Sequence, residues 1–128
     1  MTFEEEVGKL NELAPTVQAL ANYATSLFPH SKLVHKGNRW VCDPRNFVAF
    51  EIRWKRRGVA VVTLRGMTSE FEKQTALPIR KARSASYSEC VIETARHLGP
   101  AVAYVARAAA LYRVGPRRSF TRPEELEL

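Results

Sequence analysis

Cysteine and long hydrophobic runs are both scarce in this chain of 128 residues. Its two cysteines, Cys42 and Cys90, are too few for a disulfide framework. No apolar run approaches the roughly 20 residues that a helix needs to cross a bilayer, so we expect no membrane protein. The N-terminal sequence MTFEEEVGKL is acidic and amphipathic, which is the reverse of the order in a signal peptide. The sequence therefore predicts a protein of the reducing cytoplasm.

Motifs for catalysis and metal binding are also missing. The chain has no glycine-rich phosphate loop and no G-x-S-x-G sequence. Cys90 and His97 lie seven residues apart on an expected helix, about 10 Å along its axis, too far to share a zinc ion. His35 and Cys42 flank a hairpin but lie one pair out of register. We expect no catalytic residue, no metal site and no cofactor.

Positive charge, by contrast, is in surplus. Twenty basic residues against thirteen acidic ones give a net charge of +7, and residues 30–66 alone carry nine basic residues against Asp43 and Glu51. Residues 1–14 are acidic, with four glutamates and one lysine. A central segment with this surplus attracts polyanions, so the expected partner is nucleic acid or another polyanion.

The length and the apolar fraction of 45% fit one globular domain, which we place at residues 1–114. Residues 115–128 begin with the Gly-Pro pair that ends the last helix, and we expect them to form a C-terminal tail.

Two helices are expected at the N-terminus. Thr2 and Glu5 have the spacing of a capping box, and apolar residues then recur at helical spacing over residues 3–13. Pro15 lacks an amide donor and favours the start of a second helix, which Phe28-Pro29 ends.

From residue 31 the apolar period changes from helical to two, which indicates strands. We expect strands at 31–36, 39–43, 46–54 and 59–66. They are joined at Gly37-Asn38, at an Asp43-Pro44 turn and at Arg56-Arg57-Gly58, whose glycine suits a positive φ. Short connections of this kind predict a four-stranded antiparallel meander.

The last third predicts a long helix with a kink. Residues 67–87 mix a short helix near Ser69–Gln74 with a basic stretch at 79–83 that fits strand or loop. Ser86 or Ser88 suits the cap of a helix reaching residue 113, and Gly99-Pro100 interrupts it. The expected fold is α+β: two N-terminal helices, the meander and a long kinked C-terminal helix.

Alternation sorts the strand residues onto two faces of the sheet. We expect helices to cover an aliphatic face formed by Val34, Val41, Val48, Phe50, Ile52, Val62 and Leu64. The opposite face then collects His35, Trp40, Phe47, Ala49, Glu51, Arg53, Val61, Thr63 and Arg65. A slip of one residue would exchange the faces.

Aromatic rings among arginines suit single-stranded nucleic acid. Trp40 and Phe47 would stack on bases, while Arg53, Arg65, Arg56 and Arg57 would hold phosphates. The sequence therefore predicts a small, basic, non-enzymatic binding module. Three other interpretations stay open for this composition: a sheet layer half covered by the C-terminal helix with cross-strand ion pairs, a homodimer interface, or a small anionic ligand held in a pocket between the sheet and that helix.

A further alternative is a metal-dependent nuclease. Asp43 and the Glu51-Ile52-Arg53 segment resemble the Asp…Glu-x-Lys signature of the restriction-nuclease superfamily. Arg53 stands where that signature has lysine, and a guanidinium does not release its proton near neutral pH.

The segment NFVAFEIRWKRRGVAVVTLR, residues 46–65, resembles the central hairpin of a small bacterial family labelled predicted transport protein, of unknown function. Members of that family occur alone or appended to nuclease-like proteins. An Asn-Phe opens the strand, a basic turn follows, and a helix comparable to residues 88–113 lies downstream. The resemblance implies a fold like the one expected above and supplies no catalytic residues.

Overall fold

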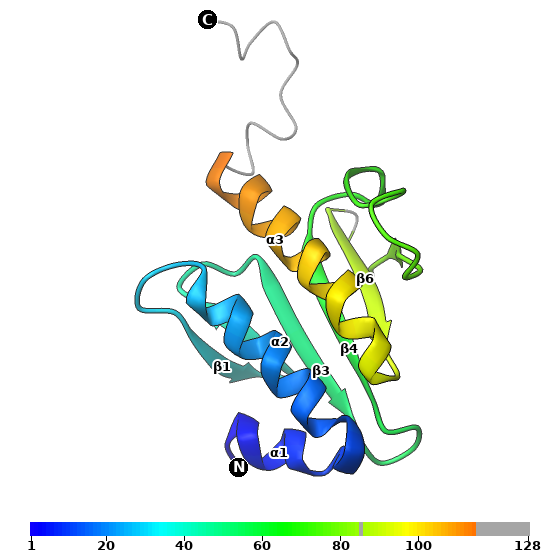
Figure 1. The fold of residues 1–128 in the computed structure, drawn as a ribbon. Coiled ribbons are helices and arrows are strands. Elements are labelled where there is room, and N and C mark those ends of the chain that lie inside the picture. The colour runs from blue at the N-terminus through cyan, green and yellow to red at the C-terminus, as the bar shows by residue number, and fades with distance from the viewer. Residues whose placement is uncertain (85, 115–128) are drawn as a thin grey trace, which may run out of the picture.

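A computed structural model describes residues 1–84 and 86–114 of the chain. Helices α2 (Ala14–Ser26) and α3 (Leu98–Val114) lie side by side on one face of a sheet, and α1 (Phe3–Gly8) lies near one end of α2 (Figure 1). The expected tail at 115–128 lies outside the described residues. Within them, no helix is long and apolar enough to cross a membrane.

The N-terminal residues form the expected capping box. Thr2 Oγ1 accepts a hydrogen bond from Glu5 N at 3.1 Å, and Thr2 N donates to Glu5 Oε1 at 2.7 Å. The expected helix at 3–13 is shorter, because the backbone at Asn11 turns to a positive φ of 57° after α1 and enters the 3₁₀ helix η1 (Asn11–Leu13). Pro15 lies in the first turn of α2, as expected.

The sheet is antiparallel and has six strands, not four. They are β1 (Lys32–Lys36), β2 (Arg39–Asp43), β3 (Val48–Arg53), β4 (Val59–Arg65), β5 (Arg80–Lys81) and β6 (Tyr87–Ile92). Their order across the sheet is β1-β2-β3-β4-β6-β5. The first four form the expected meander, and Gly37 and Gly58 both take the positive φ of 65° that their hairpins need.

The expected helix from residue 88 is wrong in its first part. Strand β6 occupies that segment and pairs with β4, with Ser88, Cys90 and Ile92 turned into the core. The chain then passes through the 3₁₀ helix η3 (Ala95–His97) into α3. Gly99 and Pro100 fall in the first turn of α3, where a missing amide costs no helical hydrogen bond, so they need no kink.

The connection between β4 and β5 contains a 3₁₀ helix, η2 (Thr68–Glu70), in place of the longer helix expected at Ser69–Gln74. Phe71 is fully buried against Tyr104 of α3, with ring centroids 5.7 Å apart. Tyr104 Oη donates to the backbone oxygen of Leu77 at 2.6 Å. These contacts fix the connection against α3.

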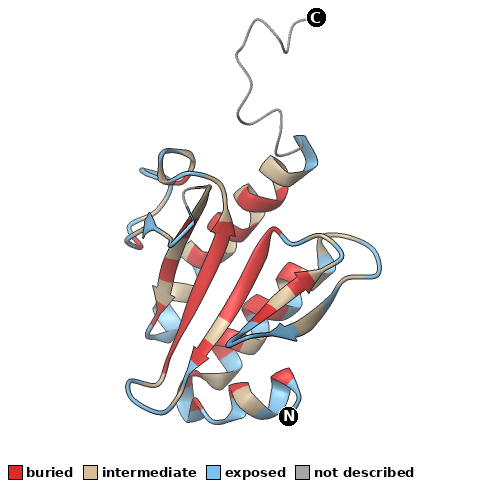
Figure 2. Cartoon of the chain, turned by 180° about the vertical axis from the view of Figure 1, so that it is seen from behind, coloured by how far each residue is buried: buried red, intermediate tan, exposed pale blue. Residues whose placement is uncertain are grey.

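The hydrophobic core lies between the helix pair and the sheet. Val17 and Leu20 of α2, Val105 of α3, and Phe50 and Val62 of the central strands are all fully buried there. Burying each such side chain contributes about 1.5–3 kcal/mol. Both helices therefore cover one face only, and Figure 2 shows the other face of the sheet without a helix over it.

The expected faces are correct for β3 and β4 and wrong for the first hairpin. Val34 pairs with Val41, and Val41 pairs with Ala49, so both valines lie on the uncovered face. Trp40 pairs with Phe50 on the covered face and is 6% exposed. Its ring meets Phe3 of α1 edge-on, with centroids 5.6 Å apart, and His35 stacks on it at 4.6 Å. The larger apolar surface of tryptophan is thus buried, and the smaller valines face outward.

Phe47 is also on the covered side. It precedes β3, is fully buried, and packs edge-on against Phe28 at a centroid distance of 5.3 Å. Tyr112 of α3 lies 6.3 Å from the same ring.

Candidate ligand-binding surface on the open face of the sheet

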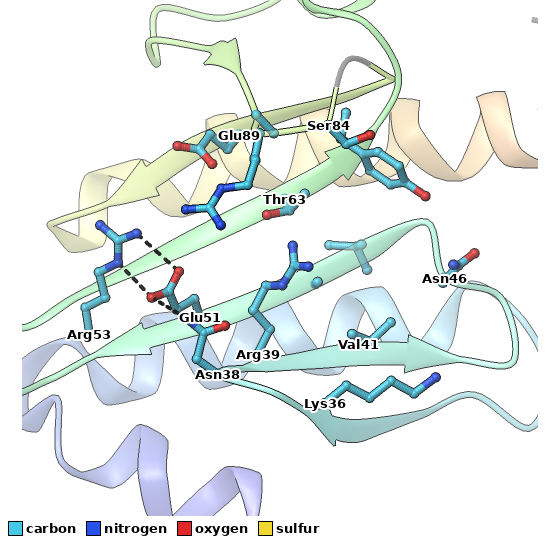
Figure 3. A pocket seen from close by; sticks show the side chains of 15 residues that line it. Lys36, Asn38, Arg39, Val41, Asn46, Glu51, Arg53, Thr63, Ser84 and Glu89 are labelled. Atoms are coloured by element: carbon cyan, nitrogen blue, oxygen red, sulfur yellow. Dashed lines mark hydrogen bonds and ion pairs between the residues drawn. The ribbon is translucent and has the colours of Figure 1, made fainter.

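The face of the sheet that carries no helix has a hollow of about 620 Å³ at its centre. We call it the sheet hollow. Small side chains form its floor, with Val41 of β2, Ala49 of β3 and Thr63 of β4 in neighbouring positions. Longer side chains stand around them (Figure 3). Because the two central strands carry small residues where the flanking segments carry long ones, the sheet surface is depressed in the middle.

Three cations border the sheet hollow and have no acidic partner in the described part of the chain. Lys36 and Arg39 come from the β1–β2 hairpin, and Arg83 comes from the segment between β5 and β6. All three are exposed. Across residues 1–84 and 86–114, no carboxylate lies within ion-pair distance of any of them. No carboxylate of the described residues therefore balances their positive charge at the rim of the sheet hollow.

The two acidic residues of the sheet hollow are both paired. Arg53 binds Glu51 through two hydrogen bonds of 3.0 and 3.2 Å, and Asn38 Nδ2 donates to the same carboxylate at 3.3 Å. The bond to Glu51 raises the pKa of Arg53 further above its ordinary value, so this guanidinium stays charged. Glu89 accepts from Arg80 Nε at 2.6 Å.

Of the arginines expected to hold phosphate, Arg53 and Arg65 lie near opposite ends of the sheet hollow. The side chain of Arg53 is 51% exposed, and an exposed pair such as Arg53–Glu51 contributes only about 0–1 kcal/mol, so a ligand can displace it. Arg65 donates to Asn46 Oδ1 at 3.3 Å and to Tyr87 Oη at 2.9 Å, both of which line the sheet hollow. Figure 3 shows Asn46 and Arg53 at its two ends.

Arg56 and Arg57 do not join this group. They lie in the β3–β4 hairpin outside the sheet hollow, and Arg57 pairs with Glu93 at 2.7 Å. Trp40 and Phe47 are buried on the covered side, so neither ring is accessible to a base. The expected aromatic and basic surface is therefore corrected to a basic one in which Tyr87 is the aromatic residue lining the sheet hollow.

Sequence reasoning missed Lys36, Arg39, Arg83 and Tyr87. Lys36 and Arg39 directly flank the Gly37-Asn38 turn, and this position places them opposite each other on one face of the hairpin. Tyr87 and Glu89 share a face by the alternation of β6, which was interpreted as helix. Correct faces for the first hairpin, whose strands are as expected, and a strand in place of the helix expected from residue 88 would identify all but Arg83.

The structure does not assemble a metal or nuclease site in the described part of the chain. No group of three histidine, cysteine, aspartate or glutamate residues there is placed to hold a metal ion. Val41 and Ala49 are paired across β2 and β3, and Asp43 and Glu51 each lie two residues from that pair, toward opposite ends of the strands. The two carboxylates are therefore separated by about four residues, or about 13 Å along the strand direction. Burial raises the pKa of the Cys90 thiol to about 12 and that of Cys42 above its ordinary value, so neither is an activated nucleophile.

The sheet hollow also differs in place from the pocket that the small-ligand alternative expected. That pocket was to lie between the sheet and the C-terminal helix. Instead, α3 packs closely on the covered face, where Ala101, Val105 and Ala108 are fully buried. The sheet hollow opens on the opposite face.

Comparison of the chain with protein families, with curated proteins and with solved structures finds no match in any of the three. The resemblance of residues 46–65 to the predicted transport protein family stays an expectation.

Proposed function

We propose that the protein is a non-enzymatic binding module that holds single-stranded nucleic acid on the open face of its sheet. The observation that supports this proposal is a set of cations around the sheet hollow that no carboxylate of residues 1–84 and 86–114 pairs: Lys36, Arg39 and Arg83. The sheet hollow runs along the central strands, with Arg53 at one end and Asn46 at the other. A groove of this kind suits the backbone of one strand, with phosphates at the basic rim and bases against the small side chains of the floor.

The distribution of charge also supports a polyanion. Residues 115–128 carry three arginines and three glutamates, so the whole surplus of +7 belongs to residues 1–114. Each phosphate neutralised on a single strand contributes about −0.7 to the slope of log affinity against log salt. Three rim cations therefore give a slope of about −2.

The test is a fluorescence anisotropy titration of a labelled thymidine oligomer of about 12 nucleotides, repeated over a range of salt concentrations. Arg39→Ala and Arg83→Ala should each weaken binding and make the slope shallower by about 0.7. Arg96→Ala is the matched control, because Arg96 is an exposed arginine of η3 that does not line the sheet hollow. Absence of binding at low salt, or an equal loss with Arg96→Ala, would overturn the proposal.

A small phosphorylated ligand is the second candidate, because 620 Å³ falls within the range of about 300–1,000 Å³ typical of small-molecule sites. The same titration separates the two candidates. Two results would support the small ligand and contradict the strand. A mononucleotide would bind as tightly as the oligomer, and the salt slope of oligomer binding would not change with oligomer length.

A further inference from the structure

Three arginines and three aromatic rings form a cluster beyond the Asn46 end of the sheet hollow. The guanidinium carbons of Arg113 and Arg45 lie 4.7 and 5.3 Å from the ring centroid of Phe28. The rings of Phe28 and Tyr112 meet edge-on at 5.8 Å. We call Phe28, Arg45, Arg65, Tyr87, Tyr112 and Arg113 the arginine–aromatic cluster.

Arg65 joins this cluster to the sheet hollow. Its guanidinium carbon lies 5.5 Å from the Tyr112 ring and 5.6 Å from the Tyr87 ring. Its Nη1 donates to Asn46 and to the Tyr87 hydroxyl, and both of these residues line the sheet hollow. The cluster therefore continues the basic surface from the open face of the sheet to the C-terminal ends of α2 and α3.

The cations of the cluster have a positioning partner but no charge partner among the described residues. Arg113 Nη2 donates to the backbone oxygen of Leu27 at 3.1 Å, and Arg45 Nη1 donates to that of Pro29 at 3.3 Å. These bonds hold the side chains against Phe28 and use one of the five N–H donors of each guanidinium. Within the described residues, every ion pair involves other arginines: Arg53, Arg57, Arg80 and Arg107.

This arrangement fits one ligand chemistry in particular. A guanidinium stacked on a ring keeps its edge free for two parallel hydrogen bonds to phosphate, and an adjacent ring or guanidinium face accepts an unpaired base. An acidic protein segment would use the charge but not the stacking surfaces. We propose that the arginine–aromatic cluster binds the continuation of the same single strand that occupies the sheet hollow. This inference rests on the proposed function.

The experiment compares two thymidine oligomers, one of about 4 nucleotides that fills the sheet hollow and one of about 12 that extends beyond it. The wild-type protein should bind the longer oligomer more tightly. Arg113→Ala and Arg45→Ala should each weaken the longer oligomer about tenfold and leave the shorter one unchanged. Arg113→Lys should keep the salt slope of the wild type but lose most of the affinity that Arg113→Ala loses, because lysine keeps the charge without the planar face.

Tyr112→Leu separates stacking from charge. It should weaken the longer oligomer about five- to tenfold with an unchanged salt slope. Thermal melts of each variant show whether the fold is intact, and Arg96→Ala serves again as the control. Arg39→Ala should weaken both oligomers, because Arg39 lies at the sheet hollow.

The outcomes are distinct. If the wild type binds neither oligomer, the proposed function is wrong, and the inference about the cluster, which rests on it, is wrong as well. If both oligomers bind with equal affinity, or if the cluster variants leave both unchanged, the sheet hollow binds the strand and the cluster does not. If the cluster variants weaken both oligomers to the same degree, the cluster does not act as a separate continuation of the site and the inference is wrong. If an acidic peptide competes with the longer oligomer equally well in wild type and Tyr112→Leu, the cluster recognises charge alone and the inference is wrong.

Discussion

The indole Nε1 of Trp40 donates a hydrogen bond to Glu6 Oε1 at 2.7 Å. This bond joins β2 to α1, two elements far apart in the sequence, and satisfies the polar atom of a side chain that is 6% exposed. Together with the edge-on contact to Phe3, it fixes which side of the first hairpin faces the helices. The open face of this hairpin consequently carries Val34 and Val41 instead of Trp40.

The role of Trp40 is therefore in stability. Trp40→Ala should lower the free energy of unfolding by about 3–5 kcal/mol. Glu6→Ala should cost about 1 kcal/mol, because it leaves the indole N–H without its acceptor. Glu4→Ala, on an exposed position of α1, should stay within about 0.5 kcal/mol. Urea denaturation measures all three, and equal effects of Glu6→Ala and Glu4→Ala would contradict a stabilising bond.

Adjacent residues of β2 provide a test of the two faces. Cys42 is fully buried on the covered face, so Cys42→Asp should place a carboxylate in the core at a cost of several kcal/mol and unfold the domain. Val41 lines the sheet hollow, so Val41→Asp should lower the free energy of unfolding by only about 1 kcal/mol. Its negative charge should weaken oligomer binding. Circular dichroism melts of the two variants give the result. Unfolding by Val41→Asp and tolerance of Cys42→Asp would reverse the assigned faces.

The connection before β5 depends on Tyr104. Tyr104→Phe removes the donor to the Leu77 carbonyl and should cost about 1–3 kcal/mol, because that oxygen loses its buried partner. Amide hydrogen exchange should also become faster in residues 71–79. Tyr23→Phe is the matched control, since the side-chain hydrogen bond found at Tyr23 among the described residues is accepted by its backbone oxygen, from Ser26 Oγ, and not made by its hydroxyl. A loss of the same size in both variants would show that the hydroxyl bond is not the cause.

Cys90 makes stability depend on pH in the alkaline range. Its pKa is raised from 9.0 to about 12 in the folded protein, mainly by burial. Above pH 9.0 the unfolded chain therefore loses a proton that the folded chain keeps, and the free energy of unfolding falls as the pH rises toward 12. Cys90→Ala should make this decline less steep, as thermal melts across that range would show. An identical decline in both proteins would mean that the thiol titrates normally.

The sequence predicted the parts of the fold whose local signals agree. The capping box at Thr2, the first-turn proline of α2 and the glycines at the hairpins each have one strong local solution, and the structure contains all of them. The antiparallel meander followed from these turns.

Two errors arose where local patterns were ambiguous. In β2, Trp40 and Cys42 lie on one face and Val41 lies on the other, and all three are apolar, so alternation alone does not choose the buried face. The contact of Trp40 with Glu6 determines it. In β6, the inward positions are Ser88, Cys90 and Ile92, which include two small residues, so the strand period was weak. The helical spacing of Val91, Ala95 and Leu98 then dominated, although pairing with β4 decides the structure.

The candidate site was only partly accessible to sequence reasoning for the same reason. Arg53 and Arg65 lie on strands with correct faces and were found. Arg39 lies on β2, for which the predicted face is wrong, and Tyr87 lies on β6, next to a segment for which the sequence predicts a helix. Neither residue is therefore among the predicted site residues. Arg83 enters the sheet hollow from a loop, where no periodicity places a side chain.

Methyl NMR during an oligomer titration tests the central claim most directly, because neighbouring residues of β4 report on opposite faces of the sheet. Val61 pairs with Glu51 on the open face and is 2% exposed, whereas Val62 lies beneath the helices on the covered face. We expect the methyl signals of Val41, Ala49 and Val61 to shift on addition of a thymidine oligomer, and those of Val62, Leu64 and Val105 to stay in place. Shifts confined to the covered-face methyls, or no shifts at a saturating concentration, would contradict binding at the open face.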